Sequence, residues 1–301
     1  MIKFQIFSFY QKGKVMTILD GKKLSEKIKE NLKNEVEELK NKGITPGLAV
    51  ILVGDDPASH TYVKMKRNAC QKVGIYSVVH EFPESITEKE LLSTIKMINE
   101  NPNIHGLLIQ LPLPKHIDTT KVLEAVDPSK DVDGFHPYNM GRLVEGLDTF
   151  APCTPLGVME IFEEYNIDLK GKDVCVVGAS NIVGKPMWAL LVNAWATVDI
   201  CHIETKDLAA HTKRADIVIV GVGKPNLITA DMVKDDVIVI DIGINKLEDG
   251  RLVGDVDFEN VSKKASYITP VPGGVGPMTI AMLLKNTVKA AGNFLKVQDD
   301  L

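Results

Sequence analysis

Three short apolar runs, each ending in a glycine-containing turn, constrain the fold of this chain more than any other feature. They are Asp173–Val177, Ala215–Val220 and Val237–Ile242. Continuous apolar strands of this length are typical of a parallel sheet that is covered by helices on both faces. The second half of the chain is therefore predicted to be a Rossmann-like, doubly wound α/β domain.

The turn after the first of these strands is rich in glycine. It is Gly178-Ala-Ser-Asn-Ile-Val-Gly184, and a predicted helix from Lys185 to Ala194 follows it. Such a turn lets backbone N–H groups and a helix N-terminus face a pyrophosphate. The spacing is GxSxxxG rather than GxGxxG, so the prediction of a dinucleotide site depends on its strand–turn–helix context. The next strand, Thr197–His202, fits a βαβ unit.

The first half of the chain also alternates between strands and helices. Its predicted strands are Leu48–Val53, Ile75–Phe82 and Gly106–Leu111, and the two prolines of Thr149–Pro155 indicate a domain seam. At 301 residues the chain is long enough for two α/β domains, each with its own core. The helices predicted from apolar periodicity and end signals are Leu24–Lys40, Ser59–Val73, Thr87–Asn99, Asp118–Val126, Pro155–Tyr165, Lys185–Ala194 and Met278–Ala291.

Tyr62 and Lys66 share one face of the helix predicted over Ser59–Val73, because they are four residues apart. A strand and the turn Gly54–Pro57 precede this helix. The aromatic ring and the amine therefore project beside the carboxyl end of a strand, where open α/β sheets place their ligands. Taken alone, such a pair is more often a solvated lysine beside a half-buried tyrosine.

Two more polar positions follow predicted buried segments. Gln110 lies at the end of an otherwise apolar strand, where an amide must find either backbone partners or a cleft. Asp131 and Asp133 precede Gly134 in a short polar run, which indicates a tight loop. This run does not complete an EF-hand pattern, so neither calcium nor any other metal is predicted.

The composition excludes several function classes. A net charge of −5 gives no general attraction to nucleic acid or to an anionic membrane, and no apolar run reaches the length of a membrane span. Four scattered cysteines without zinc spacing favour reduced thiols in a cytoplasmic protein. Residues Met1–Val15 are interpreted as an N-terminal extension, either a frayed tail or the result of an upstream translation start.

Two further segments are candidates for ligand contact. Glu204, just past the strand Thr197–His202, stands where an acid would bind a ribose 2′-hydroxyl, which favours NAD over NADP; a solvated surface glutamate is the alternative. The loop Thr269–Thr279 is rich in proline and glycine. It is either a close backbone approach to a ligand or a stiff connector that returns the chain to the first domain, and both can hold.

Taken together, these stretches resemble the bifunctional methylenetetrahydrofolate dehydrogenase/methenyltetrahydrofolate cyclohydrolase (FolD-type) family from about Met16 to the C-terminus. Several motifs in the right order are far more specific than any one of them. They are Gly54-Asp-Asp-Pro-Ala-Ser with Tyr62-Val and Lys66, Gln110-Leu-Pro-Leu-Pro114, Lys130-Asp-Val-Asp-Gly-Phe-His-Pro137, Pro152-Cys-Thr-Pro155, Gly178-Ala-Ser-Asn-Ile-Val-Gly-Lys-Pro186 and Pro270-Val-Pro-Gly-Gly-Val-Gly-Pro-Met-Thr279.

The resemblance implies an organisation and a metabolic role. It implies a folate-binding domain over 16–148 plus 278–301, a dinucleotide-binding domain over 149–277, and an active-site cleft between them. It also implies a cytoplasmic homodimer with a small-molecule folate substrate and no nucleic-acid or membrane partner. NADP is the implied cofactor, with NAD as the alternative, and the pathway is one-carbon metabolism, which serves purine, methionine and histidine biosynthesis.

The resemblance also implies roles for individual residues. The catalytic residues would be Lys66, Gln110 and Asp133: Lys66 is the cyclohydrolase residue, Gln110 contacts and tunes it, and Asp133 anchors the pterin. Tyr62 would stack on the folate, and Pro272 and Gly273 would contact the substrate. The positions that match cofactor contacts are Gly178, Ala179, Ser180, Ile203, Glu204 and Ile244.

The chemistry of the family is consistent with these residue types. Hydride transfer from 5,10-methylenetetrahydrofolate needs positioning more than acid–base help, because the bridge nitrogens stabilise the resulting cation. Hydrolysis of the methenyl form needs a group that moves protons. An amine beside a cationic, partly desolvated substrate gives up its proton more readily, which suits Lys66. The Asp133 carboxylate suits the paired N–H donors of a pterin edge.

Two departures from the family pattern and three rival interpretations remain. Trp195 replaces a small residue, and Ile203-Glu204 lacks the cationic or hydroxyl side chains that some members direct at a 2′-phosphate. The rivals are another two-domain dehydrogenase such as one acting on amino acids, a non-catalytic folate- or nucleotide-binding protein, and a monofunctional or NAD-dependent member of the same family. The amino-acid dehydrogenase interpretation gives no role to Lys66, Gln110 and Asp133. The presence of the catalytic-type Lys66 argues against a non-catalytic binding protein.

Overall fold

The computed structural model describes residues 10–11 and 14–299. The predicted extension Met1–Val15 therefore lies largely outside the described residues. The chain divides into two compact units: unit 1 comprises the described residues up to Leu24 together with Gly157–Met278, and unit 2 comprises Ser25–Leu156 together with the described residues from Thr279 onward. The predicted domain boundaries differ from these units at residues 16–24 and 149–156 and at Met278. The assignment of a ligand to each domain stays a prediction.

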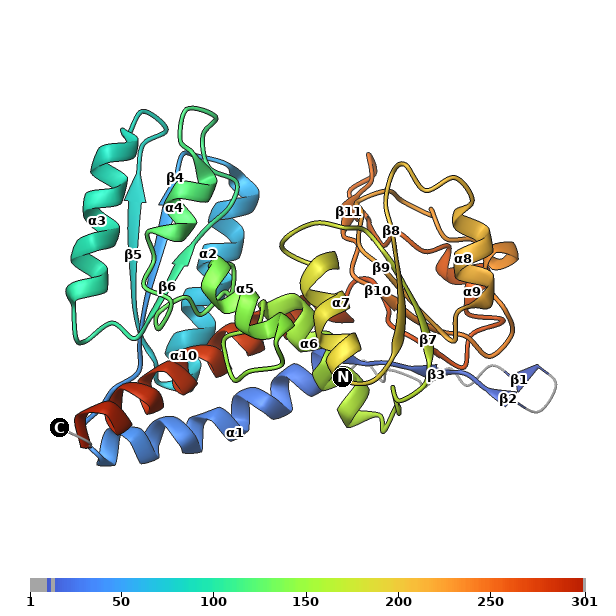
Figure 1. Ribbon diagram of the computed structural model, residues 1–301, viewed down its shortest axis with the longest axis horizontal. Coiled ribbons are helices and arrows are strands. Elements are labelled where there is room, and N and C mark those ends of the chain that lie inside the picture. The colour runs from blue at the N-terminus through green and yellow to red at the C-terminus, as the bar shows by residue number, and fades with distance from the viewer. Residues whose placement is uncertain (1–9, 12–13, 300–301) are drawn as a thin grey trace. The chain divides into compact units, whose positions relative to one another are not determined.

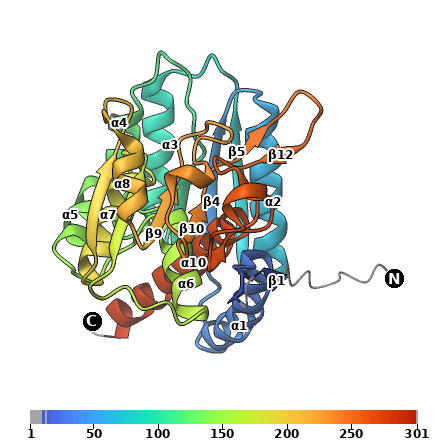
Figure 2. The same cartoon turned by 90° about the vertical axis from the view of Figure 1, so that its right-hand side faces the viewer.

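Unit 2 is built on a three-stranded parallel sheet with the order β5-β4-β6. Its strands are β4 (Gly47–Val53), β5 (Tyr76–Phe82) and β6 (Gly106–Ile109). Strands β4 and β5 lie between helices α2 (Pro57–Val73) and α3 (Glu88–Glu100), as Figures 1 and 2 show. Every residue of the central strand β4 is buried, which explains its unbroken apolar sequence.

One face of this sheet packs against α3 and the short helix α4 (Thr119–Glu124). Ala49, Ile51 and Val53, which alternate along β4, share an apolar cluster with Leu91 and Ile95 of α3. The predicted cap of α3 is present as a full capping box, because Thr87 and Glu90 each bind the other's backbone N–H.

Four more helices have at least part of their length in unit 2, and three of them cross the boundary between the units. They are α1 (Gly21–Asn41), α5 (Pro137–Val144), α6 (Cys153–Glu164) and α10 (Val275–Asp299). Helix α5 is absent from the prediction. Pro137 occupies its first turn, where the missing N–H costs nothing, so the helix begins directly after the predicted loop.

Unit 1 contains a six-stranded sheet with the order β3-β13-β10-β9-β7-β8, in which all neighbours are parallel. This is a Rossmann-like arrangement, as the sequence predicts. The strands are β3 (Thr17–Ile18), β7 (Asp173–Val177), β8 (Thr197–Cys201), β9 (Ile217–Val220), β10 (Ile238–Asp241) and β13 (Tyr267–Ile268).

The connections of this sheet include short helices and a small hairpin. The helices are α7 (Gly184–Asn193), α8 (Leu208–Arg214), the 3-10 turn η1 (Ala230–Met232) and α9 (Phe258–Val261). Strands β11 (Asn245–Lys246) and β12 (Leu252–Val253) form the antiparallel hairpin after β10. A second antiparallel pair, β1 (Tyr10–Gln11) and β2 (Lys14–Val15), precedes β3.

The cores of both units are apolar and contain all four cysteines. Cys70, Cys153, Cys175 and Cys201 are free and buried. In unit 1, Cys175 and Cys201 belong to an apolar cluster that includes Val218 and Val220 of β9 and Val239 of β10. None of the helices in the described part of the chain has both the length and the apolar character needed to span a bilayer.

Trp195 has an unusual backbone conformation. It follows α7 with φ at +63°, in the left-handed region that favours glycine, and its side chain is 77% exposed. Its carbonyl oxygen accepts a hydrogen bond of 2.9 Å from Gly171 N. Trp195 thus adopts the left-handed conformation that commonly ends a helix, here α7. Glycine adopts this conformation without strain, which is a physical reason why a small residue suits position 195 better.

Candidate active site and cofactor-binding turn

Helix α2 carries the aromatic and amine pair predicted from the sequence. Asp56 caps the helix by accepting a hydrogen bond of 2.8 Å from Ser59 N, and Pro57 occupies its first turn. Gly54, with φ at +84°, turns the chain from β4 into this cap. Tyr62 is 42% exposed and Lys66 is half-buried, one turn further along.

Lys66 and Gln110 are in direct contact. Lys66 Nζ donates a hydrogen bond of 3.0 Å to Gln110 Oε1, while Gln110 Nε2 donates one of 2.8 Å to Leu111 O. The second bond fixes the amide so that its oxygen faces the amine. Strand β6 ends at Ile109, so Gln110 is the first residue past the carboxyl end of the strand rather than part of it. The backbone partner expected for this glutamine is therefore present, and its position facing a cleft stays a prediction.

Asp133 belongs to the same polar cluster. Its side chain is partly buried, and this burial raises the pKa of the carboxyl group, while the charge of Lys66 opposes the shift and that of Asp131 adds to it. The thiol of Cys153 also interacts with Asp133, and burial raises the pKa of that thiol. Lys66, Gln110 and Asp133 thus come from three separate segments of unit 2 to one place.

Asp131 builds the loop that presents Asp133, as the prediction of a tight loop at these two aspartates implies. Its carboxylate accepts hydrogen bonds from the backbone N–H groups of Gly134, Phe135 and His136, at 3.1, 3.2 and 2.8 Å, and from Asn139 Nδ2 at 2.8 Å. Asp131 also forms a parallel bridge with Leu107, which fixes the loop beside β6. The turn-forming role therefore holds for Asp131.

A second support for this loop comes from α10. Asn286 Nδ2 donates hydrogen bonds to Val132 O at 2.8 Å and to Ala151 O at 3.2 Å. Asn286 is buried in unit 2 and more than 130 residues away in the chain from its partners. No local pattern in the sequence could have identified it.

The glycine-rich turn after β7 is shaped by close backbone contacts. Gly178 has φ at +122°, and a Cβ at Gly184 would lie 1.8 Å from Gly178 O. The start of α7 therefore packs directly on the turn, and only glycine allows this approach. Ser180 Oγ accepts a hydrogen bond of 3.2 Å from Val183 N, the residue that precedes α7. Backbone and hydroxyl groups around a helix N-terminus suit a phosphate group.

The remaining cofactor-type positions follow other strands of the same sheet. Ile203 and Glu204 are exposed after β8, Ile203 to 95%, and Glu204 N donates a hydrogen bond of 3.2 Å to His202 Nδ1. Ile244 is 46% exposed after β10. All of these residues stand at carboxyl ends of parallel strands in unit 1, the edge where such sheets bind ligands.

The loop with Pro272 and Gly273 lies in unit 1, not with Lys66 in unit 2. Gly273 has φ at +107°, and its carbonyl oxygen accepts a hydrogen bond of 2.8 Å from Lys22 N. A Cβ at Gly21 would lie 1.9 Å from Gly274 O. The described residues from Thr279 onward belong to unit 2, so the loop precedes the return of the chain to that unit. Substrate contact by Pro272 and Gly273 stays a prediction.

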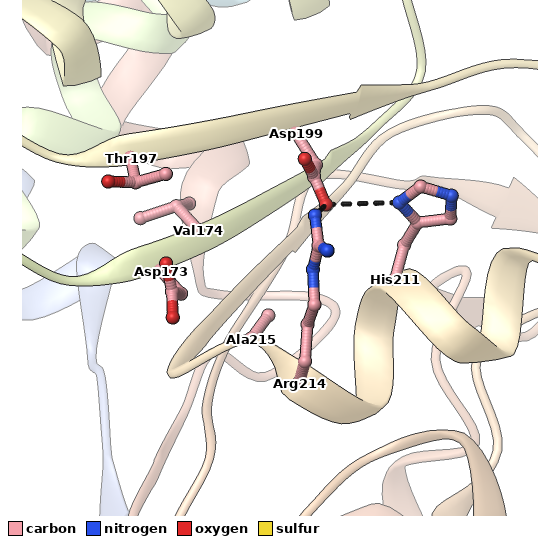
Figure 3. Close-up of a pocket in the computed structure, with 7 residues that line it drawn as sticks. All are labelled: Asp173, Val174, Thr197, Asp199, His211, Arg214 and Ala215. Carbon is pink, nitrogen blue, oxygen red and sulfur yellow. Dashed lines mark hydrogen bonds and ion pairs between the residues drawn. The ribbon is translucent and has the colours of Figure 1, made fainter.

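Two pockets lie apart from the Lys66 cluster and from the cofactor-type positions of unit 1. A cavity of about 10 Å³, large enough for one water molecule, is lined by residues of β7, β8 and α8, and Figure 3 shows His211 and Arg214 directed at Asp199 there. These two partners hold the pKa of Asp199 below its usual range. A larger hollow of about 330 Å³ lies on another face of α2, between His60, Lys64 and Arg67 and the edge strand β5.

The part of the chain that the structure describes contains no group of three or more His, Cys, Asp or Glu side chains arranged to hold a metal ion.

Comparison with known proteins decides the family. Residues 19–133 match the catalytic domain of tetrahydrofolate dehydrogenase/cyclohydrolase, and residues 152–295 match the NAD(P)-binding domain of the same enzymes. The chain belongs to the tetrahydrofolate dehydrogenase/cyclohydrolase family. It is 96% identical over 281 residues to a bifunctional protein FolD from Nautilia profundicola, a match that covers 93% of this chain and 99% of the relative.

Solved structures of the tetrahydrofolate dehydrogenase/cyclohydrolase family agree in fold with this chain. A bifunctional FolD enzyme from Campylobacter jejuni has a TM-score of 0.92 at 61% identity, covering 92% of this chain and 99% of that one. A FolD enzyme from Trypanosoma brucei, solved with NADP cofactor and an inhibitor, has a TM-score of 0.89 at 37% identity, covering 93% and 99%. The resemblance read from the motifs is confirmed, and the chain is an enzyme with dehydrogenase and cyclohydrolase domains.

Proposed function

We propose that this protein oxidises 5,10-methylenetetrahydrofolate to the 5,10-methenyl form with NADP⁺ and hydrolyses the methenyl form to 10-formyltetrahydrofolate. The contact between Lys66 Nζ and Gln110 Oε1 carries the proposal, since it places a proton-carrying amine and its orienting amide together beside Asp133. Membership of the family supports both activities.

Unit 2 supplies the groups for the folate and for hydrolysis. Tyr62, exposed on the same face of α2 as Lys66, stacks on the folate, and Asp133 accepts hydrogen bonds from the pterin edge. Water adds to the methenyl carbon while Lys66 accepts its proton. The carbon–nitrogen bond to the ring then breaks, one proton of the water ends on the ring nitrogen, and the other leaves to solvent.

Gln110 acts by holding Lys66 in place. Its amide is neutral, so it orients the amine without adding a charge that would keep the amine protonated. Its own orientation is fixed by the bond from Nε2 to Leu111 O. Gln110 therefore gives Lys66 one direction in which to meet the water and the ring nitrogen.

Unit 1 supplies the groups for NADP. Gly178 and Gly184 let the turn pack closely on the start of α7, because a Cβ at either position would meet backbone within 2.8 Å. The N–H groups at this helix start then suit the pyrophosphate. Ala179 and Ser180 complete this turn, while Ile203, Glu204 and Ile244 stand at the neighbouring strand ends. When bound, the oxidised nicotinamide accepts the hydride that leaves the one-carbon bridge.

Initial rates with NADP⁺ and NAD⁺ offered separately test this proposal. Turnover of 5,10-methylenetetrahydrofolate with NADP⁺ and slower turnover with NAD⁺ is the expected result, and Glu204 then points away from the 2′-phosphate. Turnover with NAD⁺ alone would overturn the NADP assignment and give Glu204 a ribose role. No turnover with either cofactor, in folded protein, would overturn the dehydrogenase activity.

We also propose that the protein is a homodimer. Strand β5 supports this, because it ends the three-stranded sheet, none of its seven residues is buried, and Tyr76 is 53% exposed. An exposed edge strand is a ready template for pairing with a second chain. Light scattering is expected to give twice the chain mass for the wild type and a lower mass for Tyr76→Lys. A monomeric wild type at micromolar concentration would refute the proposal.

A cytoplasmic location and a role in supplying one-carbon units for purine, methionine and histidine biosynthesis are proposed as well. The four free, buried cysteines support a reducing compartment. Fractionation of cells that express the chain should recover the activity in the cytoplasmic fraction. Loss of the gene should create a requirement for these three products, and normal growth without them would contradict the role.

A further inference from the structure

Two aspartates are buried side by side at the carboxyl edge of the sheet in unit 1, and neither belongs to the predicted site. Asp241 ends β10 and is 4% exposed, and Asp255 follows the hairpin β11–β12 and is completely buried. Burying one carboxylate is costly, and burying two together is more so. The hydrogen bonds that Asp241 and Asp255 accept show which loops the two carboxylates hold in place.

Asp255 joins two loops of the sheet edge. Its Oδ2 accepts hydrogen bonds from Val222 N at 2.6 Å and Gly223 N at 3.0 Å, in the turn after β9. Its Oδ1 accepts one of 2.8 Å from Asn245 Nδ2, at the start of the hairpin and next to Ile244. One carboxylate thus fixes the turn after β9 relative to the segment after β10.

Asp241 holds Asp255 in its position. Its Oδ1 accepts hydrogen bonds from Gly243 N at 2.9 Å and from Asp255 N at 3.0 Å, and its Oδ2 accepts one of 2.9 Å from Val256 N. Its own N–H donates to Thr269 Oγ1 at 2.7 Å, just past β13. The two aspartates therefore connect the ends of β9, β10 and β13.

Glycines leave the space that the two carboxylates fill. A Cβ at Gly243 would lie 2.3 Å from Asp255 Cγ, and a Cβ at Gly254 would lie 1.8 Å from Asp241 Oδ2. The donors given above are backbone N–H groups and one amide, not cations. Burial raises the pKa of Asp241 to about 6, and the negative charge of Asp255 contributes to this shift.

The strand order shows which part of the cofactor these loops would meet. The phosphate-type turn follows β7, and the ribose-type position Glu204 follows β8, while β9 and β10 lie on the other side of β7. A dinucleotide whose pyrophosphate is at the β7 turn and whose adenosine is at β8 therefore extends its nicotinamide half toward β9 and β10. Val222 and Ile244, which flank the Asp255 contacts, are 43% and 46% exposed.

We propose that Asp255, together with Asn245, is a positioning residue for hydride transfer: it holds the Val222–Gly223 turn and the Ile244 segment in the geometry that receives the nicotinamide half of NADP. The proposal rests on the function proposed above and adds residues that touch neither substrate nor cofactor. Asp241 supports the arrangement by fixing Asp255.

An exchange of two side chains tests the proposal. In Asp255→Asn only one oxygen remains. If it faces the Val222 and Gly223 N–H groups, the new NH₂ faces the Asn245 amide, which must turn its own oxygen inward and leave its wild-type orientation. In the double variant with Asn245→Asp, the amide oxygen at 255 can face the two N–H groups, and its NH₂ can face the carboxylate at 245. Net charge is the same as in the wild type, and only the long 3.5 Å bond from Asn245 Nδ2 to Val253 O is lost.

The readouts are NADP⁺ binding by calorimetry, dehydrogenase kcat and KM, hydrolysis of supplied methenyltetrahydrofolate, and Tm. For Asp255→Asn, the dissociation constant and KM for NADP⁺ are expected to rise about tenfold and dehydrogenase kcat to fall, as for the loss of a charged hydrogen bond. Hydrolysis should stay within about twofold, because Lys66 and its partners are in unit 2 and this step uses no hydride. The double variant should recover most of the loss.

Asp249→Asn is the matched control, because Asp249 is an exposed carboxylate in the same hairpin. It should leave NADP⁺ binding, dehydrogenase kinetics and hydrolysis unchanged, and it should change Tm only slightly, because its ion pair with Arg251 is exposed. A lower Tm for Asp255→Asn with unaltered NADP⁺ binding and KM would overturn the proposal and leave Asp255 a purely structural role. Failure of the double variant to restore binding while it restores Tm would also overturn it. A wild type without dehydrogenase activity would instead overturn the proposed function.

Discussion

The cluster around Lys66 and the aspartate pair in unit 1 differ in how their polar groups are satisfied. Among the described residues, Lys66 Nζ makes one hydrogen bond, to Gln110, and the neighbouring Tyr62 ring is 42% exposed. Asp241 and Asp255 are buried and each accepts three hydrogen bonds. A group that must exchange protons keeps donor capacity for its substrate, whereas a group that holds loops is saturated by its own chain.

The largest expected effect is on hydrolysis in Lys66→Met. Removing the proton-carrying amine should lower the rate by about 100-fold or more, the range typical of a lost general acid or base. NADP⁺ binding should be unchanged, since the residues proposed to bind the cofactor lie in unit 1. The measurement is the decay of methenyl absorbance at constant pH. Lys64→Met is the control, because Lys64 is an exposed lysine on the same helix; equal decay in both variants would remove Lys66 from the mechanism.

The next largest expected effect is the pH dependence of the free energy of unfolding, and it concerns Asp241 in the aspartate pair of unit 1. The folded-state pKa of Asp241 is about 6, above the ordinary value of 3.8. The folded protein therefore binds this proton more tightly than the unfolded chain, and the stabilising contribution of the proton is lost as pH rises through 6. Relative to Asp241→Asn, the wild type should become more stable as pH falls from 7 toward 4, by up to about 1.4 kcal/mol per pH unit.

Urea unfolding of both proteins across this range measures the difference. Asp249→Asn is a control for which the pH dependence of stability should have the opposite direction, because hydrogen bonds from Arg251 lower the pKa of the exposed Asp249 carboxyl group. A difference between the wild type and Asp241→Asn that does not change with pH would show that Asp241 keeps one protonation state throughout.

A smaller effect on hydrolysis is expected from Gln110→Ala. Without the amide oxygen Lys66 samples more orientations, and a misplaced catalytic group commonly costs about tenfold or more. The unfolding midpoint in urea should change little, because Gln110 stands past the end of β6 and is only partly buried. Hydrolysis at the wild-type rate in this variant would mean that Lys66 is oriented by other groups.

The smallest effect is expected at Trp195, outside both regions. Its φ of +63° is strained for any residue with a Cβ, so Trp195→Gly should raise the free energy of unfolding by about 0.5–1 kcal/mol. Both enzymatic rates should stay the same. A loss of stability would show that the exposed indole makes contacts that outweigh the backbone strain.

Local sequence patterns predicted most of the helices and strands, but few of the polar residues that hold the loops between them in place. Strand β7 has the predicted bounds, and the capping box of α3 is present. Tyr62 and Lys66 are one turn apart in α2, so they share a face as predicted. Each of these features depends on neighbouring residues. Helix α10 begins at Val275 rather than Met278, since Pro277 is tolerated in a first turn. The contact between Lys66 and Gln110 came from the resemblance and from strand-end placement.

The short strands and loop-holding residues that the sequence did not reveal depend on contacts between distant segments of the chain. Two-residue strands such as β3 and β13 are too short to show a period, and they pair across about 250 residues of chain. Asp131 and Asp255 have the sequence context of ordinary turn residues, and Asp241 lies near the end of a predicted strand. Only the folded chain shows that each collects several N–H donors in a buried place.

The most direct test of the account is one time course of methenyl absorbance after 5,10-methylenetetrahydrofolate and NADP⁺ are mixed with the wild-type protein. Two activities in one chain predict that the methenyl form rises and then decays faster than in a sample without protein, while NADPH remains. NADPH formation with decay of the methenyl form at the protein-free rate would contradict the cyclohydrolase role of Lys66. The absence of any NADPH would contradict the dehydrogenase.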